Sequence, residues 1–214
     1  WMNSEQRANY YVLLDDETLF VRAQPVSLML DESNVAPPYF EARLLRTGES
    51  VHKYEPYPRP FTGSSADKLS PLRLYEGTRA MKPDRSKFVE AMVWLPQLNI
   101  LDLHSWEMDS YRLKGACDFG DLAERQQRLV YSYGGIAVSD ERIYALYAGT
   151  KVDEPWKCSM LHVYDWNGKL IRKLDLGRLI NRISLDPANP DLLYGCRWET
   201  MEVFRYDLSQ QDTL

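Results

Sequence analysis

The sequence has few cysteines and none at paired spacing. The 214-residue chain contains three, Cys117, Cys158 and Cys196, an odd number spread far apart. Zinc sites and disulfide frameworks use cysteines in closely spaced pairs or in even-numbered sets. We therefore expect neither a disulfide framework nor a zinc knuckle, and we interpret the three cysteines as free thiols.

Other features that the sequence lacks narrow the class of protein. No apolar run reaches the roughly 18 residues of a membrane helix, so we expect no membrane span in this chain. The net charge is −5, and the basic residues are spread among acidic ones, which is not typical of a nucleic-acid-binding protein. No nucleophile elbow, phosphate loop or dinucleotide fingerprint occurs. We therefore predict no catalytic residues and no cofactor.

The three histidines give no sign of a metal site. His52, His104 and His162 each lack a second histidine or a cysteine at the spacing of metal ligands. His162 alternates with apolar residues in an outer strand, so we expect its side chain to face solvent or a neighbouring blade. The sequence predicts no metal-binding residue.

Sustained helical periodicity is also missing, apart from a short turn of helix expected within residues 118–129. What recurs is a hairpin of two short apolar strands around an aspartate-bearing turn. It is found at residues 12–20, 80–88, 137–144 and 184–194. The turn aspartates, at intervals that shorten toward the length of a four-stranded blade, are Asp15, Asp84, Asp140 and Asp186.

A second, outer hairpin follows each of the first three inner ones, at residues 40–54, 98–113 and 160–174. In the last of these, Asn167-Gly168 between alternating apolar runs is a strong hairpin signal. Aspartates at the ends of outer strands repeat the rhythm, at Asp102, Asp165 and Asp207. Because aspartate accepts hydrogen bonds from turn amides, we interpret both aspartate series as structural.

These two series predict an all-β protein, a β-propeller with about four blades visible, in a single domain over residues 1–214. Gly134-Gly135 is expected to precede an inner strand and to allow close backbone packing. The chain opens at Trp1, and the outer hairpin that begins at residues 201–208 has no return strand. We therefore expect the propeller to be incomplete at one or both ends.

The pattern resembles the TolB-like six-bladed propeller proteins of Bacteroides and its relatives. The resemblance is carried by residues 77–89, residues 135–147 and the Asn167-Gly168 hairpin. It implies a bacterial propeller with two further blades and a periplasmic or cell-surface lipoprotein location, and it implies no catalytic residues. The Trp-Asp dipeptides of WD-repeat propellers are absent.

Propeller topology indicates where a ligand would bind. Loops that lead into innermost strands and loops between second and third strands gather on one face around the channel. On these loops, Arg79 and Arg182 hold similar places, as do Trp156 and Trp198. Tryptophan and arginine are enriched in binding hot spots. The candidate ligand-binding residues are Arg79, Tyr133, Trp156, Arg182, Arg197 and Trp198. In a purely structural alternative, each arginine pairs with an acid of a neighbouring blade and each tryptophan packs between blades.

The sequence thus favours a non-enzymatic module that binds a small molecule or a protein. The alternative is a propeller hydrolase or lyase acting on a carbohydrate or a small ester, because propellers also host enzymes. In that case Arg79, Tyr133, Asn181 and Arg182 would orient the substrate. A third possibility is an accessory region whose activity lies in other sequence.

Overall fold

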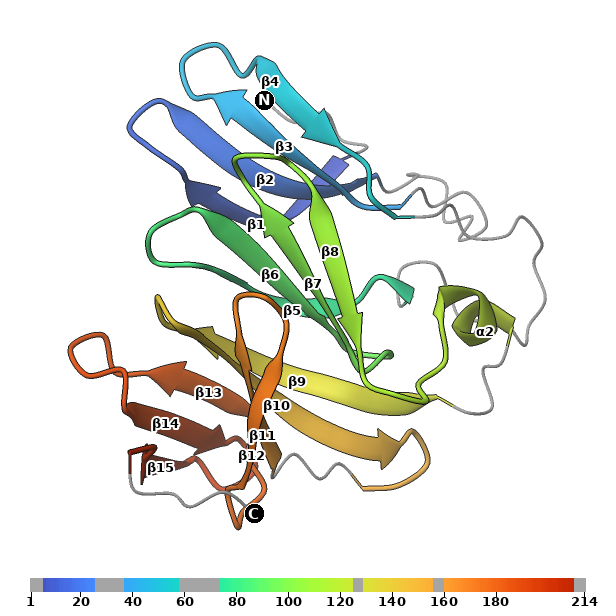
Figure 1. Ribbon diagram of the computed structural model, residues 1–214, viewed down its shortest axis with the longest axis vertical. Coiled ribbons are helices and arrows are strands. Elements are labelled where there is room, and N and C mark those ends of the chain that lie inside the picture. The colour runs from blue at the N-terminus through green and yellow to red at the C-terminus, as the bar shows by residue number, and fades with distance from the viewer. Residues whose placement is uncertain (1–5, 26–36, 58–73, 125–128, 156–159, 210–214) are drawn as a thin grey trace. The chain divides into compact units, whose positions relative to one another are not determined.

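The computed structural model (Figure 1) describes residues 6–25, 37–57, 74–124, 129–155 and 160–209. These residues form fifteen β-strands and one short helix, which confirms the all-β prediction. The chain divides into two compact units, residues 1–75 with 119–127 and residues 76–118 with 128–214. No helix among the described residues is long and apolar enough to cross a membrane.

The first unit contains one four-stranded antiparallel sheet. Its strands are β1 (Gln6–Leu13), β2 (Thr18–Pro25), β3 (Tyr39–Leu44) and β4 (Ser50–Tyr54), paired in chain order. Because side chains alternate along a strand, Phe20 and Phe40 share one face of the sheet, with ring centroids 5.9 Å apart. Helix α2 (Phe119–Glu124) confirms the predicted turn of helix, and the Phe119 ring lies 6.1 Å from that of Tyr57.

The second unit contains three antiparallel sheets, each paired in chain order. The first consists of β5 (Gly77–Met81), β6 (Lys87–Met92), β7 (Gln97–Asp102) and β8 (Met108–Arg112). The second consists of β9 (Val130–Val138), β10 (Arg142–Lys151), β11 (Met160–Asp165) and β12 (Leu170–Asp175). The third consists of β13 (Arg182–Leu185), β14 (Leu192–Arg197) and β15 (Glu202–Asp207). All predicted inner and outer hairpins are confirmed.

The β9–β12 sheet packs against both other sheets of the second unit, one on each face (Figure 1). Alternation along β10 separates the two contacts. Ile143 and Ala145 join an apolar layer with Val89, Ala91, Leu98 and Ile100 of the β5–β8 sheet. Tyr144 and Leu146 join a second layer that includes Leu161, Val163, Leu193 and Leu208. Two buried apolar layers therefore hold the three sheets together.

The aspartates of the inner hairpins lie in turns and those of the outer series end strands, as predicted. Asp15 Oδ1 accepts hydrogen bonds from the backbone N–H groups of Glu17 and Thr18, both at 2.8 Å. The same type of bond to a following backbone N–H is made by Asp84, Asp102, Asp165, Asp186 and Asp207. These six side chains stabilise the turns, which explains their periodic spacing.

Two local predictions are wrong. In the β9–β10 turn, Ser139 and not Asp140 fixes the backbone, since Ser139 Oγ accepts from the N–H groups of Glu141 and Arg142. Gly134 and Gly135 lie inside β9 and do not precede it. A Cβ at Gly135 would lie 3.7 Å from its nearest neighbours, which is ordinary van der Waals contact, so close packing does not require this glycine.

Candidate functional site

Arg182 and Trp198 are the predicted site residues that the structure brings together. Arg182 begins β13, and Trp198 directly follows β14. The guanidinium carbon of Arg182 lies 4.5 Å from the centroid of the Trp198 ring. Nη1 of Arg182 also donates to the carbonyl oxygens of Gly134, at 3.0 Å, and Asn181, at 2.9 Å. These contacts fix the guanidinium over the indole as a cation–π pair.

The buried side chain of Asn181 holds the backbone of Trp198 in place. The Asn181 side chain is buried, and its Oδ1 accepts a hydrogen bond of 2.9 Å from the backbone N–H of Trp198. The backbone N–H of Asn181 donates to the carbonyl of Cys196 at 2.8 Å. Although its backbone is held in this way, the Trp198 residue remains 52% exposed. A large ring with a fixed backbone thus faces the surface.

Further apolar side chains are exposed beside Trp198. Met201 lies in the turn that follows, where its N–H donates to the Trp198 carbonyl at 3.3 Å, and Val203 lies on β15. Val203 is opposite Cys196, which is opposite Arg182, so Val203 and Arg182 share one face of the sheet. Both Met201 and Val203 are exposed. We call Arg182, Trp198, Met201 and Val203 the Arg182–Trp198 surface.

The structure places Arg79 in a different environment. Its Nε lies 2.6 Å from Oε1 of Glu90, on the neighbouring strand β6, and the Arg79 side chain is only 13% exposed. The Glu90 carboxylate is fully buried. Gly77 leaves room for this pair, because a Cβ there would lie 2.8 Å from Glu90 Cγ. Arg79 is therefore part of a buried ion pair within its own sheet.

Arg79 and Arg182 point to opposite faces of their sheets. Arg182 is opposite Cys196, and the corresponding pair in the β5–β8 sheet is Thr78 opposite Ala91. Arg79 is one residue further along. Because successive side chains of a strand alternate between faces, this offset of one residue sends the two arginines in opposite directions. The similar sequence positions of the two arginines do not produce similar sites.

Tyr133 is a core residue and does not lie on a loop. It is inside β9 and almost fully buried, which corrects its predicted placement before the inner strand. Its hydroxyl oxygen lies 2.6 Å from the Tyr164 hydroxyl. Burial raises the pKa of Tyr133, and burial also raises the pKa of Tyr164 to about 12. The two phenols are therefore neutral and pair with each other in the interior.

His162 belongs to the same buried cluster. It is 2% exposed and lies opposite Ala145, which packs against the β5–β8 sheet, so of the two predicted alternatives its side chain faces the neighbouring sheet and not solvent. Its ring stacks on Tyr147 with centroids 4.4 Å apart, and its Nδ1 lies 3.4 Å from the Tyr164 hydroxyl. Burial, together with the charge of Lys173, lowers the pKa of His162 to about 4.

The two remaining predicted site residues are Arg197 and Trp156. Arg197 is partly exposed, and its Nε lies 3.7 Å from Oε2 of Glu199. Trp156 lies outside the described residues, as does Cys158. In the part of the chain that the structure describes, no three histidine, cysteine or acidic side chains are grouped to hold a metal ion.

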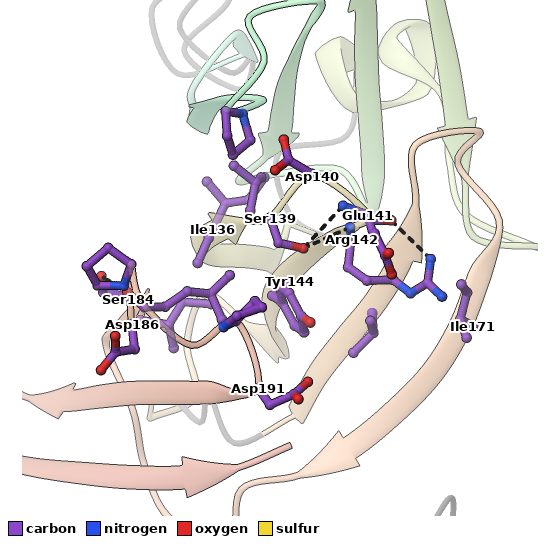
Figure 2. A pocket seen from close by; sticks show the side chains of 18 of the residues that line it. Ile136, Ser139, Asp140, Glu141, Arg142, Tyr144, Ile171, Ser184, Asp186 and Asp191 are labelled. Carbon is purple, nitrogen blue, oxygen red and sulfur yellow. Dashed lines mark hydrogen bonds between the residues drawn. The ribbon is translucent and has the colours of Figure 1, made fainter. Parts of the chain in front are cut away.

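A cleft of about 900 Å³ is the feature that the sequence did not reveal. It lies between the β9–β12 and β13–β15 sheets, beside the β9–β10 and β13–β14 turns (Figure 2). Its lining residues include the last three of the four residues of β13, Ile183, Ser184 and Leu185, but not Arg182, the first residue of that strand. None of the four residues of the Arg182–Trp198 surface lines the cleft, so the two features do not share a residue. Two acidic turns were the available signal, but sequence spacing alone does not show that they share a cavity.

No family model matches this chain, and neither does any curated protein. Solved structures do match it. The β-propeller domain of Cps50 (Swd1) from Myceliophteria thermophila aligns over 95% of this chain and 54% of that one, with 11% identity and a TM-score of 0.57. Hydrazine synthase of Kuenenia stuttgartiensis aligns over 89% and 55% respectively, with 10% identity and a TM-score of 0.51. The chain thus spans about half the length of these two structures.

A third match is the acylaminoacyl peptidase of Pyrococcus horikoshii. It covers 98% of this chain and 32% of the peptidase, with 9% identity and a TM-score of 0.54. Likeness at such low identity shows the fold alone, since one fold hosts many unrelated functions. The TolB-like resemblance, the number of six blades and the cellular location stay predictions. The conclusion from these comparisons is that the chain has a β-propeller fold, with four blade-like sheets visible.

Proposed function

We propose that this chain is a non-enzymatic binding module, part of a single propeller domain, that recognises a protein partner through the Arg182–Trp198 surface. One observation carries the proposal. Trp198 is half exposed while Asn181 fixes its backbone and the Arg182 guanidinium covers one side of its ring. An aromatic ring that is already ordered loses little conformational freedom when a partner covers it.

The residue types support the same conclusion. Tryptophan and arginine dominate binding hot spots because they combine a large apolar area with directed hydrogen bonds. Met201 and Val203 extend the apolar area beside them, and both are exposed. Several apolar side chains exposed together are typical of an interaction site, whereas single exposed ones are common.

The pairing of the strands shows that the exposure of Val203 is unusual within the second unit. Val203 is opposite Cys196, and the corresponding pair in the β9–β12 sheet is Leu161 opposite Leu146. Both of those leucines are fully buried between two sheets. Val203 is 67% exposed. The outward face of the β13–β15 sheet thus keeps apolar side chains at positions that are covered elsewhere, as expected for a surface that a partner covers.

The test is a peptide-display selection with the wild-type chain as bait. Enriched peptides are then measured by fluorescence anisotropy against the wild type, Trp198→Ala and Arg182→Ala. We expect Trp198→Ala to weaken binding about tenfold or more, as truncation of a hot-spot tryptophan does. Tyr11→Ala, which removes an exposed aromatic side chain from β1, is the matched control and should bind the peptides normally.

Two outcomes would overturn the proposal. In the first, the enriched peptides bind Trp198→Ala as tightly as the wild type while the variant keeps its circular dichroism spectrum. In the second, Trp198→Ala leaves peptide binding unchanged but alters the thermal stability or oligomeric state. That result would mean that a further β-sheet of the propeller covers this face.

The hydrolase or lyase alternative stays a prediction with its own test. It requires turnover of a glycoside or ester substrate that is lost in Arg182→Ala. A periplasmic or cell-surface location, implied by the TolB-like resemblance, likewise belongs to the proposal and is tested by fractionation of the native host.

A further inference from the structure

The cleft between the β9–β12 and β13–β15 sheets is separate from the Arg182–Trp198 surface and has its own chemistry (Figure 2). We propose that it binds the side chain of a lysine carried by an apolar peptide segment. The cleft has an apolar wall, a negative rim, and the hydroxyl group of Tyr144 in its lining.

The walls of the cleft are apolar where the two sheets meet. Side chains of β9, β11, β12 and β13 contribute, namely Ile136, Val163, Ile171, Ile183 and Leu185. Ile171 is exposed, whereas Val163 is buried. Such a wall suits the four methylene groups of a lysine side chain, which pack on apolar surface while the charged end stays at a polar rim.

The rim carries a net negative charge. Four carboxylates, from Asp140, Glu141, Asp186 and Asp191, and two guanidinium groups, from Arg142 and Arg172, line the cleft. Both arginines already donate to backbone carbonyls, Arg142 to Glu141 at 3.0 Å and Arg172 to Leu208 at 3.2 Å. An excess of carboxylates at the mouth of a cleft attracts a cation. The balance of charge therefore favours an ammonium group over an anion.

Tyr144 brings a hydroxyl group to the lining of the cleft. It is only 6% exposed, it lines the cleft, and its hydroxyl makes no hydrogen bond to any residue that the structure describes. Figure 2 shows it between the β9–β10 turn and Asp191. Burial raises the pKa of Tyr144, and the charge of Asp191 raises it further, so the phenol is neutral. A tyrosine hydroxyl in the lining of a cleft that makes no hydrogen bond to these residues can take one from a ligand.

The chemistry of these groups matches an ammonium ion. A neutral tyrosine hydroxyl accepts a hydrogen bond through its oxygen, and the carboxylate of Asp191 accepts as well. The lysine ammonium has three N–H donors, enough for both oxygens and for one water molecule. The carboxylate of Asp186 is already engaged by the backbone N–H of Ala188 and the hydroxyl of Tyr194. We therefore assign recognition to Tyr144 and Asp191.

The experiment uses a fluorescent pentapeptide with a central lysine between valine and leucine. Its counterparts carry acetyl-lysine or norleucine at the same place. We expect the lysine peptide to bind the wild-type chain about tenfold more tightly than the acetyl-lysine peptide, since a charge-assisted hydrogen bond is lost on acetylation. The affinity should fall as salt is added, because the rim is open to solvent.

Variants locate the site. Asp191→Asn and Tyr144→Phe should each weaken lysine-peptide binding about threefold to tenfold, with no change for the norleucine peptide. Asp153→Asn is the matched control, because Asp153 is an exposed acid in the turn after β10, outside the cleft, and it should bind normally. Trp198→Ala should also bind normally, which separates this test from that of the proposed function.

Three results would overturn the inference. Equal affinity for the lysine and acetyl-lysine peptides would exclude recognition of the charge. Unchanged affinity in both Asp191→Asn and Tyr144→Phe would place the lysine elsewhere. Cadaverine binding as tightly as the lysine peptide would show that a free amine, and not a peptide segment, is the ligand.

Discussion

The β5–β8 and β13–β15 sheets each pack one apolar face against the β9–β12 sheet, and they differ in the other face. On the β5–β8 sheet, this other face carries polar residues directly opposite one another on adjacent strands, Arg79, Glu90, Asn99 and Ser110. Glu90 and Asn99 are buried, and each has a side-chain partner, Arg79 at 2.6 Å and Ser110 at 2.8 Å.

On the β13–β15 sheet, the corresponding face is open. Arg182, Val203 and Arg205 are exposed on it, and Trp198 extends it at the end of β14. The contrast between the two faces shows that burial decides whether an arginine has a structural role or can bind another molecule. A buried arginine requires a partner and becomes structural, whereas an exposed arginine on an ordered ring is free to contact another molecule.

The largest effect should come from Arg79→Met. It leaves the buried Glu90 carboxylate without its guanidinium, which should cost about 3–5 kcal/mol of unfolding free energy. Arg182→Met should cost less than about 1 kcal/mol, the worth of an exposed cation–π pair. Urea denaturation measures both. A double variant, Arg79→Met with Glu90→Leu, should recover much of the stability that Arg79→Met loses. Equal losses of stability in Arg79→Met and Arg182→Met would contradict the contrast between a buried and an exposed arginine.

A second pair of variants compares apolar residues at equivalent positions. Leu161→Ala creates a cavity between the β9–β12 and β13–β15 sheets and should destabilise the chain by about 2–5 kcal/mol. Val203→Ala, on the open face, should change stability by less than about 0.5 kcal/mol. If Val203→Ala is as harmful as Leu161→Ala in chemical denaturation, the outward face of the β13–β15 sheet is covered in solution.

The pH dependence of stability tests the buried cluster around His162. Its pKa in the folded chain is about 4, below the ordinary value of about 6.5 for histidine. The unfolded chain therefore binds a proton that the folded chain does not, and stability falls as the pH drops from about 6.5 to about 4. The loss should be about 2 kcal/mol at about pH 5.

His162→Phe should abolish this part of the pH dependence, as measured by urea denaturation at several pH values. His104→Phe, in an exposed turn, is the control and should retain it. The lowered pKa values of Asp84, at about 2, and of Asp102 act at lower pH and do not obscure the window. A wild-type stability that stays constant between about pH 6.5 and 4 would show that His162 is hydrated.

The smallest effect concerns the β9–β10 turn. Ser139→Ala removes the acceptor for two backbone N–H groups and should cost about 1 kcal/mol. Asp140→Ala should leave stability unchanged, because Asp140 is exposed and does not fix this turn. Thermal melting distinguishes the two. If Asp140→Ala lowers the melting temperature more than Ser139→Ala does, Asp140 stabilises this turn, as the sequence predicted.

Much of the fold was predictable because its signals are local. Alternating apolar residues define the strands, and Asn167-Gly168 and the turn aspartates define the hairpins. Part of the candidate site was predictable for the same reason, since Asn181, Arg182 and Trp198 flank strands that pair directly. Arg79 and Tyr133 were not, because a shift of one residue moves a side chain to the other face, and strand boundaries are uncertain by more than that.

The sequence by itself determined the all-β class, the repeated hairpins and the residues that turn the chain, because each depends on neighbours a few residues apart. Only the tertiary structure decided which polar residues are buried and paired, which remain exposed, and where a cleft opens. Those properties depend on how one sheet packs against another, and the packing involved joins residues far apart in the chain, such as Tyr144 and Leu193.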